Sequence, residues 1–322
     1  MKICIVGPGA IGGSIAQRFA AHSGQDVSVL ARGAALEAIR RNGITLICRG
    51  RRDTVAVRAS SAPAKLGPQD VVILALKAYS LATVAPTLTP MLTPETIVVP
   101  VQNGVPWWYF YKEGGRLDGS RLISIDPDGA IERVLTSRQA IGAVTYAGAR
   151  VPEPGVIDLS LDELMLFGEP DGSSSKRLAE IVALFERAGF KCQATAEIRK
   201  AIWLKLWGNA TINPVSVLAN ATIDRLITDP AVKATLSAAM LEVRAVAGAL
   251  GMTFDLTLEQ RFAQAADLGA FKTSMLQDLE AGRALEIEAL VGVVVELAHK
   301  LAVKVPVMET IYALTRLRGL RA

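Results

Sequence analysis

The first half of the chain alternates between short apolar runs and longer segments in which apolar residues recur at helical spacing. This pattern predicts strands at 2–6, 26–30, 71–76 and 96–101 and helices at 11–22 and 34–42. Runs that are apolar along their whole length are typical of parallel strands that are covered on both faces of a sheet. This half is therefore expected to be an α/β Rossmann domain with a doubly wound, mostly parallel sheet.

The next stretch, 106–141, has no clear period. It contains the aromatic run Trp107–Phe110, for which three interpretations stay open: packing of this segment, an oligomer contact, or a pocket wall. Regular patterns return with expected strands at 140–146 and 163–167 and an expected helix at 176–188.

Strand patterns end at about residue 195, and only helical spacing follows. At about 100–200 residues per domain, a chain of 322 residues is expected to form two domains. We expect the Rossmann domain to span 1–194 and an all-α substrate or dimerisation domain to span 195–322, with the boundary between Phe190 and Glu197. The helices expected in the second domain are 198–219, 230–250, 256–266, 274–300 and 307–317.

Composition and charge narrow the classes of function. Hydrophobic residues make up 51% of the chain and charged residues 20%, which favours a folded chain with a large core over disorder. The net charge of +4 is spread thinly, and the one basic cluster lacks interleaved aromatic residues. We interpret this cluster (Arg49, Arg51, Arg52 and Arg58) as a solvated loop and expect no nucleic-acid partner.

Cysteine usage and hydropathy also exclude some classes. The three cysteines are far apart and odd in number, which indicates neither a disulfide framework nor a metal site. No apolar stretch reaches the roughly 20 residues of a membrane-spanning helix. The start MKICIVGPG lacks the charged and apolar regions of a signal peptide. We expect no membrane association and a cytoplasmic location.

The sequence Gly7-Pro8-Gly9-Ala10-Ile11-Gly12 is a GxGxxG motif. Such a motif is weak evidence alone, but here it directly follows an expected strand and opens an expected helix. Gly7 would allow the tight turn, Gly9 the approach of a pyrophosphate, and Gly12 the close packing of helix on strand. All six residues are therefore candidates for cofactor binding, with the helix N-terminus facing the phosphates.

The end of the second expected strand indicates which dinucleotide is bound. An NAD enzyme usually places Asp or Glu there, whereas this chain has Leu30-Ala31-Arg32. Arg32 could pair with a 2′-phosphate, so we predict NADPH as the cofactor. The alternative is a solvated arginine at the start of a helix.

Two further expected strands end in polar residues. Lys77 follows 71–76 and could reach a ribose or phosphate oxygen, and Asn103 follows 96–101 and could orient a nicotinamide amide or a substrate. The alternatives are a surface lysine and ordinary Asn-Gly turn chemistry.

Polar residues recur within the apolar segment 201–214 of the second domain. Lys205, Asn209 and Asn213 stand four residues apart, which places them on one face of a continuous helix. Buried without partners they would be costly, so this face is either solvated or lines a ligand pocket. We favour the pocket, because Asn is a poor residue for a helix interior.

A second polar cluster lies between residues 272 and 288. Ser274-x-x-Gln277 is interpreted as a capping box at a helix start, where a serine could also bind a carboxylate. Glu286 is expected further along the same helical segment, where a solvated position is the alternative.

Together these strings resemble the ketopantoate reductase (2-dehydropantoate 2-reductase) family over nearly the whole chain. The matching strings are GPGAIGG, LARG, LKAY, VQNGV, KLWGNATINP and KTSMLQDLEAGRALEIE. The resemblance implies NADPH-dependent reduction of a 2-oxo acid, ketopantoate, to pantoate. It also implies a possible homodimer through the C-terminal helices.

The resemblance also implies roles for single residues. Lys205 would donate the proton to the 2-keto oxygen, and Glu286 would contact cofactor and substrate. Asn103, Asn209, Asn213 and Ser274 would bind the substrate, together with Lys205. Arg32, Lys77, Asn103 and the backbone of Ala147 would bind the cofactor.

The chain departs from the family pattern in its expected substrate pocket. A further asparagine, expected about ten residues after Asn213, is replaced by Ile223, and Phe271 stands where close relatives look to have a histidine. Two alternatives therefore stay open. One is a paralogous reductase of another 2-oxo acid, and the other is a non-catalytic NADPH-binding sensor. A sensor would tend to lose Lys205 and Glu286, which this chain keeps.

Overall fold

The structure is a computed structural model that describes residues 1–320, apart from the side chains of residues 161–163. Contacts within the chain divide it into two compact units. The α/β unit comprises Met1–Gln102, Pro106–Arg121 and Asp128–Ile198, and the helical unit comprises Asn103–Val105, Leu122–Pro127 and Arg199–Ala322. Two short segments from the middle of the chain, 103–105 and 122–127, therefore pack with the C-terminal residues and belong to the helical unit.

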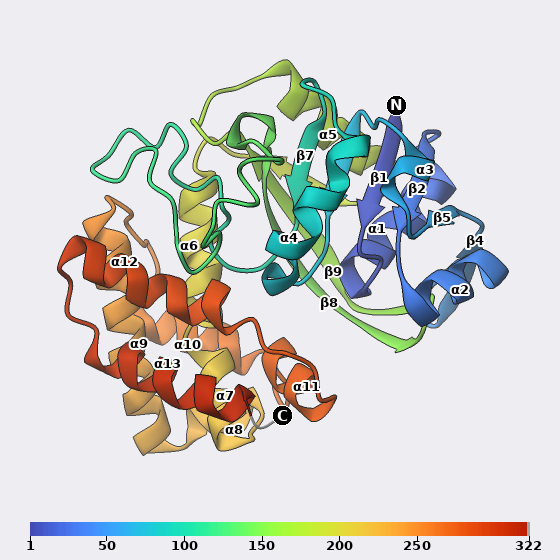
Figure 1. Cartoon of the computed structure of the whole chain (residues 1–322). Helices are drawn as coiled ribbons and strands as arrows, with labels where there is room; N and C mark the ends of the chain where they lie inside the picture. Colours follow the sequence, from blue (N-terminus) through green and yellow to red (C-terminus); the bar gives the residue numbers. More distant parts are fainter. Residues whose placement is uncertain (321–322) are drawn as a thin grey trace. The chain divides into compact units, whose positions relative to one another are not determined.

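The first sheet of the α/β unit has the strand order β5-β2-β1-β6-β7, and every neighbouring pair is parallel (Figure 1). Its strands are β1 (Lys2–Val6), β2 (Asp26–Leu30), β5 (Arg58–Ser60), β6 (Val71–Leu74) and β7 (Ile97–Pro100). All residues of β6 and β7 are buried, as are Ile3–Val6 of β1. The prediction of a Rossmann-type sheet covered on both faces is therefore confirmed.

Helices and short 3₁₀ turns connect these strands. They are α1 (Ala10–His22), α2 (Gly33–Asn42), α3 (Pro63–Leu66), α4 (Ala78–Val84), η1 (Ala85–Met91), η2 (Ser137–Gln139) and α5 (Lys176–Arg187). Helix α1 is buried along most of its length and contacts strands of both sheets of the unit. Its Phe19 meets Phe185 of α5 edge to face, with ring centroids 4.8 Å apart, in the shared core.

A second, mixed sheet completes the α/β unit. Its order is β10-β9-β3-β4, with β8 paired antiparallel to β9. The strands are β3 (Ile44–Cys48), β4 (Arg51–Val55), β8 (Gly142–Glu153), β9 (Val156–Gly168) and β10 (Lys191–Ala194). In Figure 1, β8 and β9 form a long hairpin.

The basic cluster is exposed to solvent, as expected, but the expectation that it forms a loop was wrong for three of its four arginines. Arg51 and Arg52 begin β4, which pairs antiparallel with β3, and Arg58 begins β5. Arg49 and Gly50 form the connecting turn with φ of 51° and 78°. The side chains of β4 are almost all exposed, so its sequence has too few apolar positions to predict a strand.

The aromatic run Trp107–Phe110 packs inside the α/β unit. All four side chains are buried. The indole N–H of Trp107 donates to the carbonyl of Leu135 at 2.8 Å, and Trp108 packs so tightly on Gly142 that a Cβ there would lie 2.7 Å from the ring. Of the three interpretations, packing of the segment 106–141 accounts for this run.

Within the described residues, the helical unit packs nine helical segments. They are α6 (Ile198–Asn209), α7 (Ile212–Ala219), α8 (Ile223–Thr228), α9 (Pro230–Ala249), α10 (Leu258–Ala266), α11 (Ser274–Glu280), the π-helix η3 (Glu288–Gly292), α12 (Val293–Leu301) and α13 (Pro306–Gly319). The long helix α9 contacts α8, α12 and α13, and its buried face includes Met240 and Val243. Trp207 of α6 donates its indole N–H to the carbonyl of Met240 at 2.8 Å, which joins α6 to α9. Among the described residues, no helix is both long and apolar enough to span a membrane.

Two of the expected long helices are interrupted. The helix expected at 198–219 breaks at residues 210–211, four residues before Pro214, which has no N–H to donate to the carbonyl of Ala210. The helix expected at 274–300 ends at Glu280, where Gly282 turns the chain with φ of 63°. Arg283 then pairs with Asp278 at 2.9 Å and holds this turn.

Candidate active site

The glycine loop connects β1 to α1 in the α/β unit. Gly7 has φ of 87°, a region that favours glycine, and a Cβ there would lie 2.6 Å from the side chain of Leu76. A Cβ on Gly12 would lie 2.3 Å from the carbonyl oxygen of Gly7, a backbone atom that cannot move aside. A Cβ on Gly9 would meet nothing within 4 Å, so this side of the loop is open.

The open side of the loop is suited to an anion. Helix α1 begins at Ala10 with Gly9 as its N-cap, no side chain caps it, and no acidic residue lies in its first turn. The first N–H groups of a helix carry partial positive charge and have no acceptor within the helix. The loop from Gly7 to Gly12, including Pro8 and Ile11, therefore fits the pyrophosphate of a dinucleotide.

Two cations lie at the carboxyl ends of strands in the same sheet. Arg32 follows β2, is exposed, and is the N-cap residue of α2. No acidic residue stands between the end of β2 and Arg32. Lys77 follows β6 as the N-cap residue of α4 and is partly buried.

Ala147 and Asn103 occupy different units. Ala147 lies in β8 at an irregularity, because its pairing with β9 shifts register between Tyr146 and Gly148. Asn103 belongs to the helical unit, because its neighbour Gly104 packs on the backbone of η3: a Cβ on Gly104 would lie 2.2 Å from the carbonyl oxygen of Ala289.

Lys205 of α6 and Glu286 lie close enough for their charges to interact. Part of the Lys205 side chain remains accessible, but protein atoms enclose its ammonium group. This desolvation lowers the pKa of Lys205 from 10.5 to about 8, while the negative charge of Glu286 acts in the opposite direction. The lysine can therefore change its protonation state close to neutral pH.

Glu286 does not lie within a helix, contrary to the sequence-based expectation. It precedes η3, and the N–H of Leu290 donates to its carbonyl at 3.3 Å. Only 6% of its surface is exposed, so the alternative of a solvated glutamate is wrong. The break after α11 carries this carboxylate into the unit, beside Lys205.

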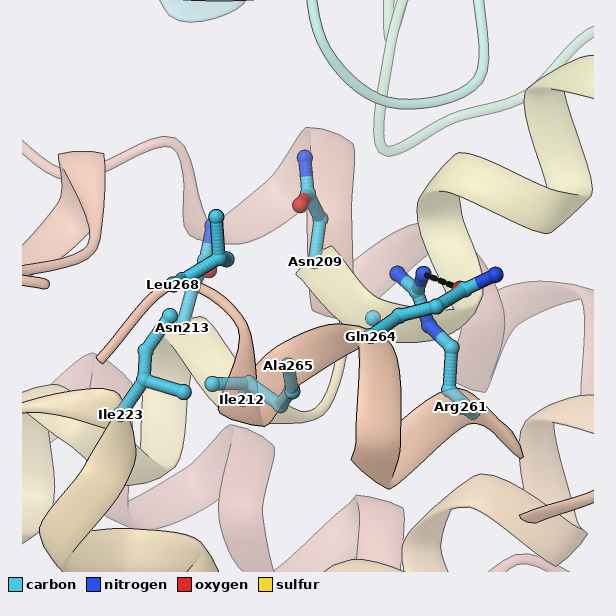
Figure 2. Close-up of a pocket in the computed structure, with 9 residues that line it drawn as sticks. Asn209, Ile212, Asn213, Ile223, Arg261, Gln264, Ala265 and Leu268 are labelled. Atoms are coloured by element: carbon cyan, nitrogen blue, oxygen red, sulfur yellow. Dashed lines mark hydrogen bonds between the residues drawn. The ribbon is translucent and has the colours of Figure 1, made fainter. Parts of the chain in front are cut away.

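A cavity of about 90 Å³ lies within the helical unit (Figure 2). Its lining residues begin shortly after Lys205 in the sequence. Asn209 of α6 and Asn213 of α7 both line it, so the helix break does not separate these two amides. The other lining residues are Gly208, Ile212, Ile223, Arg261, Gln264, Ala265 and Leu268. Neither Lys205 nor Ser274 lines this cavity.

Asn213 is joined to α11 by a chain of hydrogen bonds. The hydroxyl of Ser216 donates to the carbonyl of Asn213 at 2.7 Å and lies 2.5 Å from the hydroxyl of Thr273. Thr273, rather than Ser274, caps α11, because its hydroxyl accepts from the N–H of Leu276 at 3.1 Å. The capping box predicted for Ser274 and Gln277 is therefore wrong, and Ser274 is an exposed first residue of the helix.

Sequence reasoning missed Arg261, Gln264 and Leu268. All three lie on or just after α10, some fifty residues from the two asparagines, and no motif marks them. The one local signal was Gly208, a glycine inside a helix. A Cβ there would lie 2.1 Å from Nη2 of Arg261.

Comparison with known proteins identifies the family. The model of "Ketopantoate reductase PanE/ApbA" matches residues 3–108, and that of its C-terminal domain matches residues 197–319. A 2-dehydropantoate 2-reductase of Mesorhizobium japonicum is 42% identical over 98% of this chain and 97% of its own length. The chain belongs to the ketopantoate reductase family. It is accordingly an NAD(P)-dependent oxidoreductase that acts on a CH–OH or C=O group.

Solved structures agree with this assignment. A crystal structure described as a ketopantoate reductase of Ralstonia solanacearum MolK2 is 43% identical, with a TM-score of 0.95 over 99% of this chain and 98% of that one. A dimeric ketopantoate reductase of Staphylococcus aureus shares the fold at 21% identity, with a TM-score of 0.76 over 100% of this chain and 99% of that one.

Proposed function

We propose that the protein reduces 2-dehydropantoate (ketopantoate) to pantoate with NADPH, and that Lys205 donates the proton. One observation carries the proposal: an enclosed lysine with a pKa near 8 lies beside a buried glutamate in the unit that also holds the amide-lined cavity. The 42% identical relative with this activity supports the choice of substrate.

Lys205 would act on the keto oxygen of the substrate. Reduction of a ketone by hydride leaves an alkoxide, which an ammonium group stabilises and then protonates. A pKa of about 8 keeps Lys205 mostly protonated at pH 7, yet makes its proton easier to transfer than that of a solvated lysine. Glu286 would hold the ammonium group in place and favour its charged form.

The amides and the hydroxyl would orient the rest of the substrate. Asn209 and Asn213 present donors and acceptors at one cavity, which suits an oxygen-rich small molecule. Ser274, at the exposed start of α11, would receive a carboxylate with the help of the helix N-terminus. Asn103 would contact both substrate and cofactor, since its loop packs on η3, just after Glu286.

NADPH would supply the hydride. Arg32 supports NADPH over NADH, because an exposed guanidinium without an acid before it at the end of β2 suits a 2′-phosphate and not two ribose hydroxyls. The glycine loop, Lys77 and the backbone of Ala147 would hold the remainder of the cofactor. We also propose that the protein is cytoplasmic and forms a homodimer through its C-terminal helices; a dimeric family member supports the dimer alone.

The test is NADPH oxidation by the purified protein with ketopantoate, beside NADH and a panel of other 2-oxo acids. Turnover of ketopantoate that prefers NADPH is the expected result. Turnover of another 2-oxo acid alone would support the proposed reduction but would show that ketopantoate is not the substrate. Tight NADPH binding without any turnover would contradict the proposal and favour a sensor.

A further inference from the structure

A guanidinium group lies directly against the backbone of α6. Arg261 extends from α10, and its Nη2 occupies the space beside Gly208 where any other residue would place a Cβ, 2.1 Å away. Glycine is the least favoured residue of a helix interior after proline. The close approach of Arg261 gives a physical reason for a glycine at this position of α6.

The orientation of Arg261 is held from its own helix. Nη1 donates to Oε1 of Gln264, one turn further along α10, at 3.0 Å. Helix α10 itself begins with a complete capping box between Thr257 and Gln260. Figure 2 shows Arg261 extending from α10 toward α6 with Gln264 beside it. A planar fork of N–H donors is thus prepositioned at the cavity.

The cavity wall divides into a polar part and an apolar part. The polar part has one guanidinium, of Arg261, and three amides, of Asn209, Asn213 and Gln264, with no carboxylate among the lining residues. The apolar part is formed by Ile212, Ile223, Ala265 and Leu268. A volume of about 90 Å³ leaves room for a small terminal group of a substrate.

We infer that Arg261 determines substrate specificity by donating hydrogen bonds to an oxygen acceptor at the end of the substrate remote from the keto group. This rests on the proposed function. The aliphatic side chain of Ile223 offers no hydrogen bond at this wall, whereas Arg261 supplies charged donors at the same cavity. A guanidinium binds a carboxylate through two N–H groups and a hydroxyl oxygen less strongly. The preferred substrates are therefore 2-oxo acids whose remote end carries a carboxylate, as in a 2-oxo diacid, or a hydroxyl, as in ketopantoate.

Three substrates that differ only at one terminal group test this inference. Ketopantoate ends in a hydroxyl, 3,3-dimethyl-2-oxosuccinate ends in a carboxylate, and 3,3-dimethyl-2-oxobutanoate has neither. With NADPH, we expect kcat/KM of the diacid and of ketopantoate to exceed that of the third acid by about 10- to 100-fold. We call kcat/KM of the diacid, or of ketopantoate, divided by that of the third acid the diacid ratio and the ketopantoate ratio. Arg261→Met should lower the diacid ratio by about 100-fold and the ketopantoate ratio by about 10-fold.

Gly208→Ala is the second variant, because it keeps the charge of Arg261 and displaces only its position. The atom that must move is the end of a flexible side chain, and alanine is the better helix residue, so this variant should fold. It should lower both ratios in the same direction as Arg261→Met. Arg187→Met, an exposed arginine at the end of α5, is the matched control and should leave both ratios unchanged.

The outcomes separate the two proposals. Ratios that stay as in the wild type in both Arg261→Met and Gly208→Ala overturn the role of Arg261 while leaving the reductase function in place. Lack of turnover with every 2-oxo acid, despite NADPH binding, overturns the proposed function and this inference with it.

Discussion

The glycine loop and the cavity of the helical unit differ in how their residues are arranged along the chain. The loop takes its candidate residues from six consecutive positions between β1 and α1, and it packs on Ala75 and Leu76, which follow β6. The cavity gathers side chains from α6, α7, α8 and α10, which are spread over about sixty residues. A site whose residues are consecutive in the chain can be recognised from a motif, whereas a site made by packing distant helices cannot.

The two regions also differ in how much they can vary. Gly7 and Gly12 of the loop each meet an atom that excludes a side chain, whereas the space beside Gly9 is open. The cavity combines the amides of Asn209 and Asn213 with the aliphatic side chain of Ile223 and the charged side chain of Arg261. We therefore expect these lining side chains to vary more readily than the loop, and the terminal group that the pocket selects to vary with them.

Replacement of Lys205 by alanine should have the largest effect. Loss of a positioned general acid costs about 10²–10⁴-fold in rate, so kcat with ketopantoate should fall by this factor. NADPH affinity, measured by fluorescence titration, should change little, because the glycine loop and Arg32 are untouched. Lys176→Ala, an exposed lysine of α5, is the control. A kcat within threefold of the wild type in Lys205→Ala would remove the lysine from the mechanism.

Replacement of Arg32 by alanine tests the expected cofactor-binding residues of the α/β unit alone. Loss of a charged partner for the 2′-phosphate should raise KM for NADPH by about 10- to 100-fold and leave KM for NADH nearly unchanged. Arg41→Ala, an exposed arginine in the last turn of the same helix, should alter neither value. An equal rise for both cofactors would contradict recognition of the 2′-phosphate.

The pH profile should report the protonation of Lys205. Because its pKa is lowered to about 8 and the proton donor must be charged, kcat for reduction should be constant below this value and fall about tenfold per pH unit above it. The charge of Glu286 raises the pKa of Lys205, so Glu286→Gln should move the fall to lower pH. A fall that stays at the same pH in Glu286→Gln would show that another group titrates.

Much of the fold could be predicted because it follows from local patterns. The bounds of β1 and β2 and of helices α1, α2 and α5 agree with the expected ones to within one residue. The polar strand β4 could not be predicted, since it is stabilised by pairing with β3 and not by buried side chains of its own. The break at 210–211 arises from Pro214, which removes a backbone donor, and the helical spacing of the polar residues does not reveal it.

The residues of the candidate site likewise differ in whether the sequence indicates them. Lys205, Asn209 and Asn213 could be proposed from their spacing, and Glu286 from the resemblance. The burial of Glu286 depends on a turn that Gly282 and the Arg283–Asp278 pair create, and no helical pattern predicts it. Arg261 depends on α10 packing against Gly208, a tertiary contact that a single sequence does not reveal.

Replacement of Ile223 by asparagine should have the smallest effect and bears most directly on the cavity. Ile223 is buried at the start of α8, so the variant should lose about 1–3 kcal/mol of unfolding free energy. An amide at this wall adds a donor and an acceptor for a terminal hydroxyl, so kcat/KM of ketopantoate relative to 3,3-dimethyl-2-oxobutanoate should rise a few-fold. Leu241→Asn, an exposed leucine of α9 that does not line the cavity, is the control and should leave this ratio unchanged. The gain should be larger in the Arg261→Met background, because the arginine no longer contributes to the same recognition. Additive effects of the two substitutions would instead mean that Ile223 and Arg261 contact different parts of the substrate.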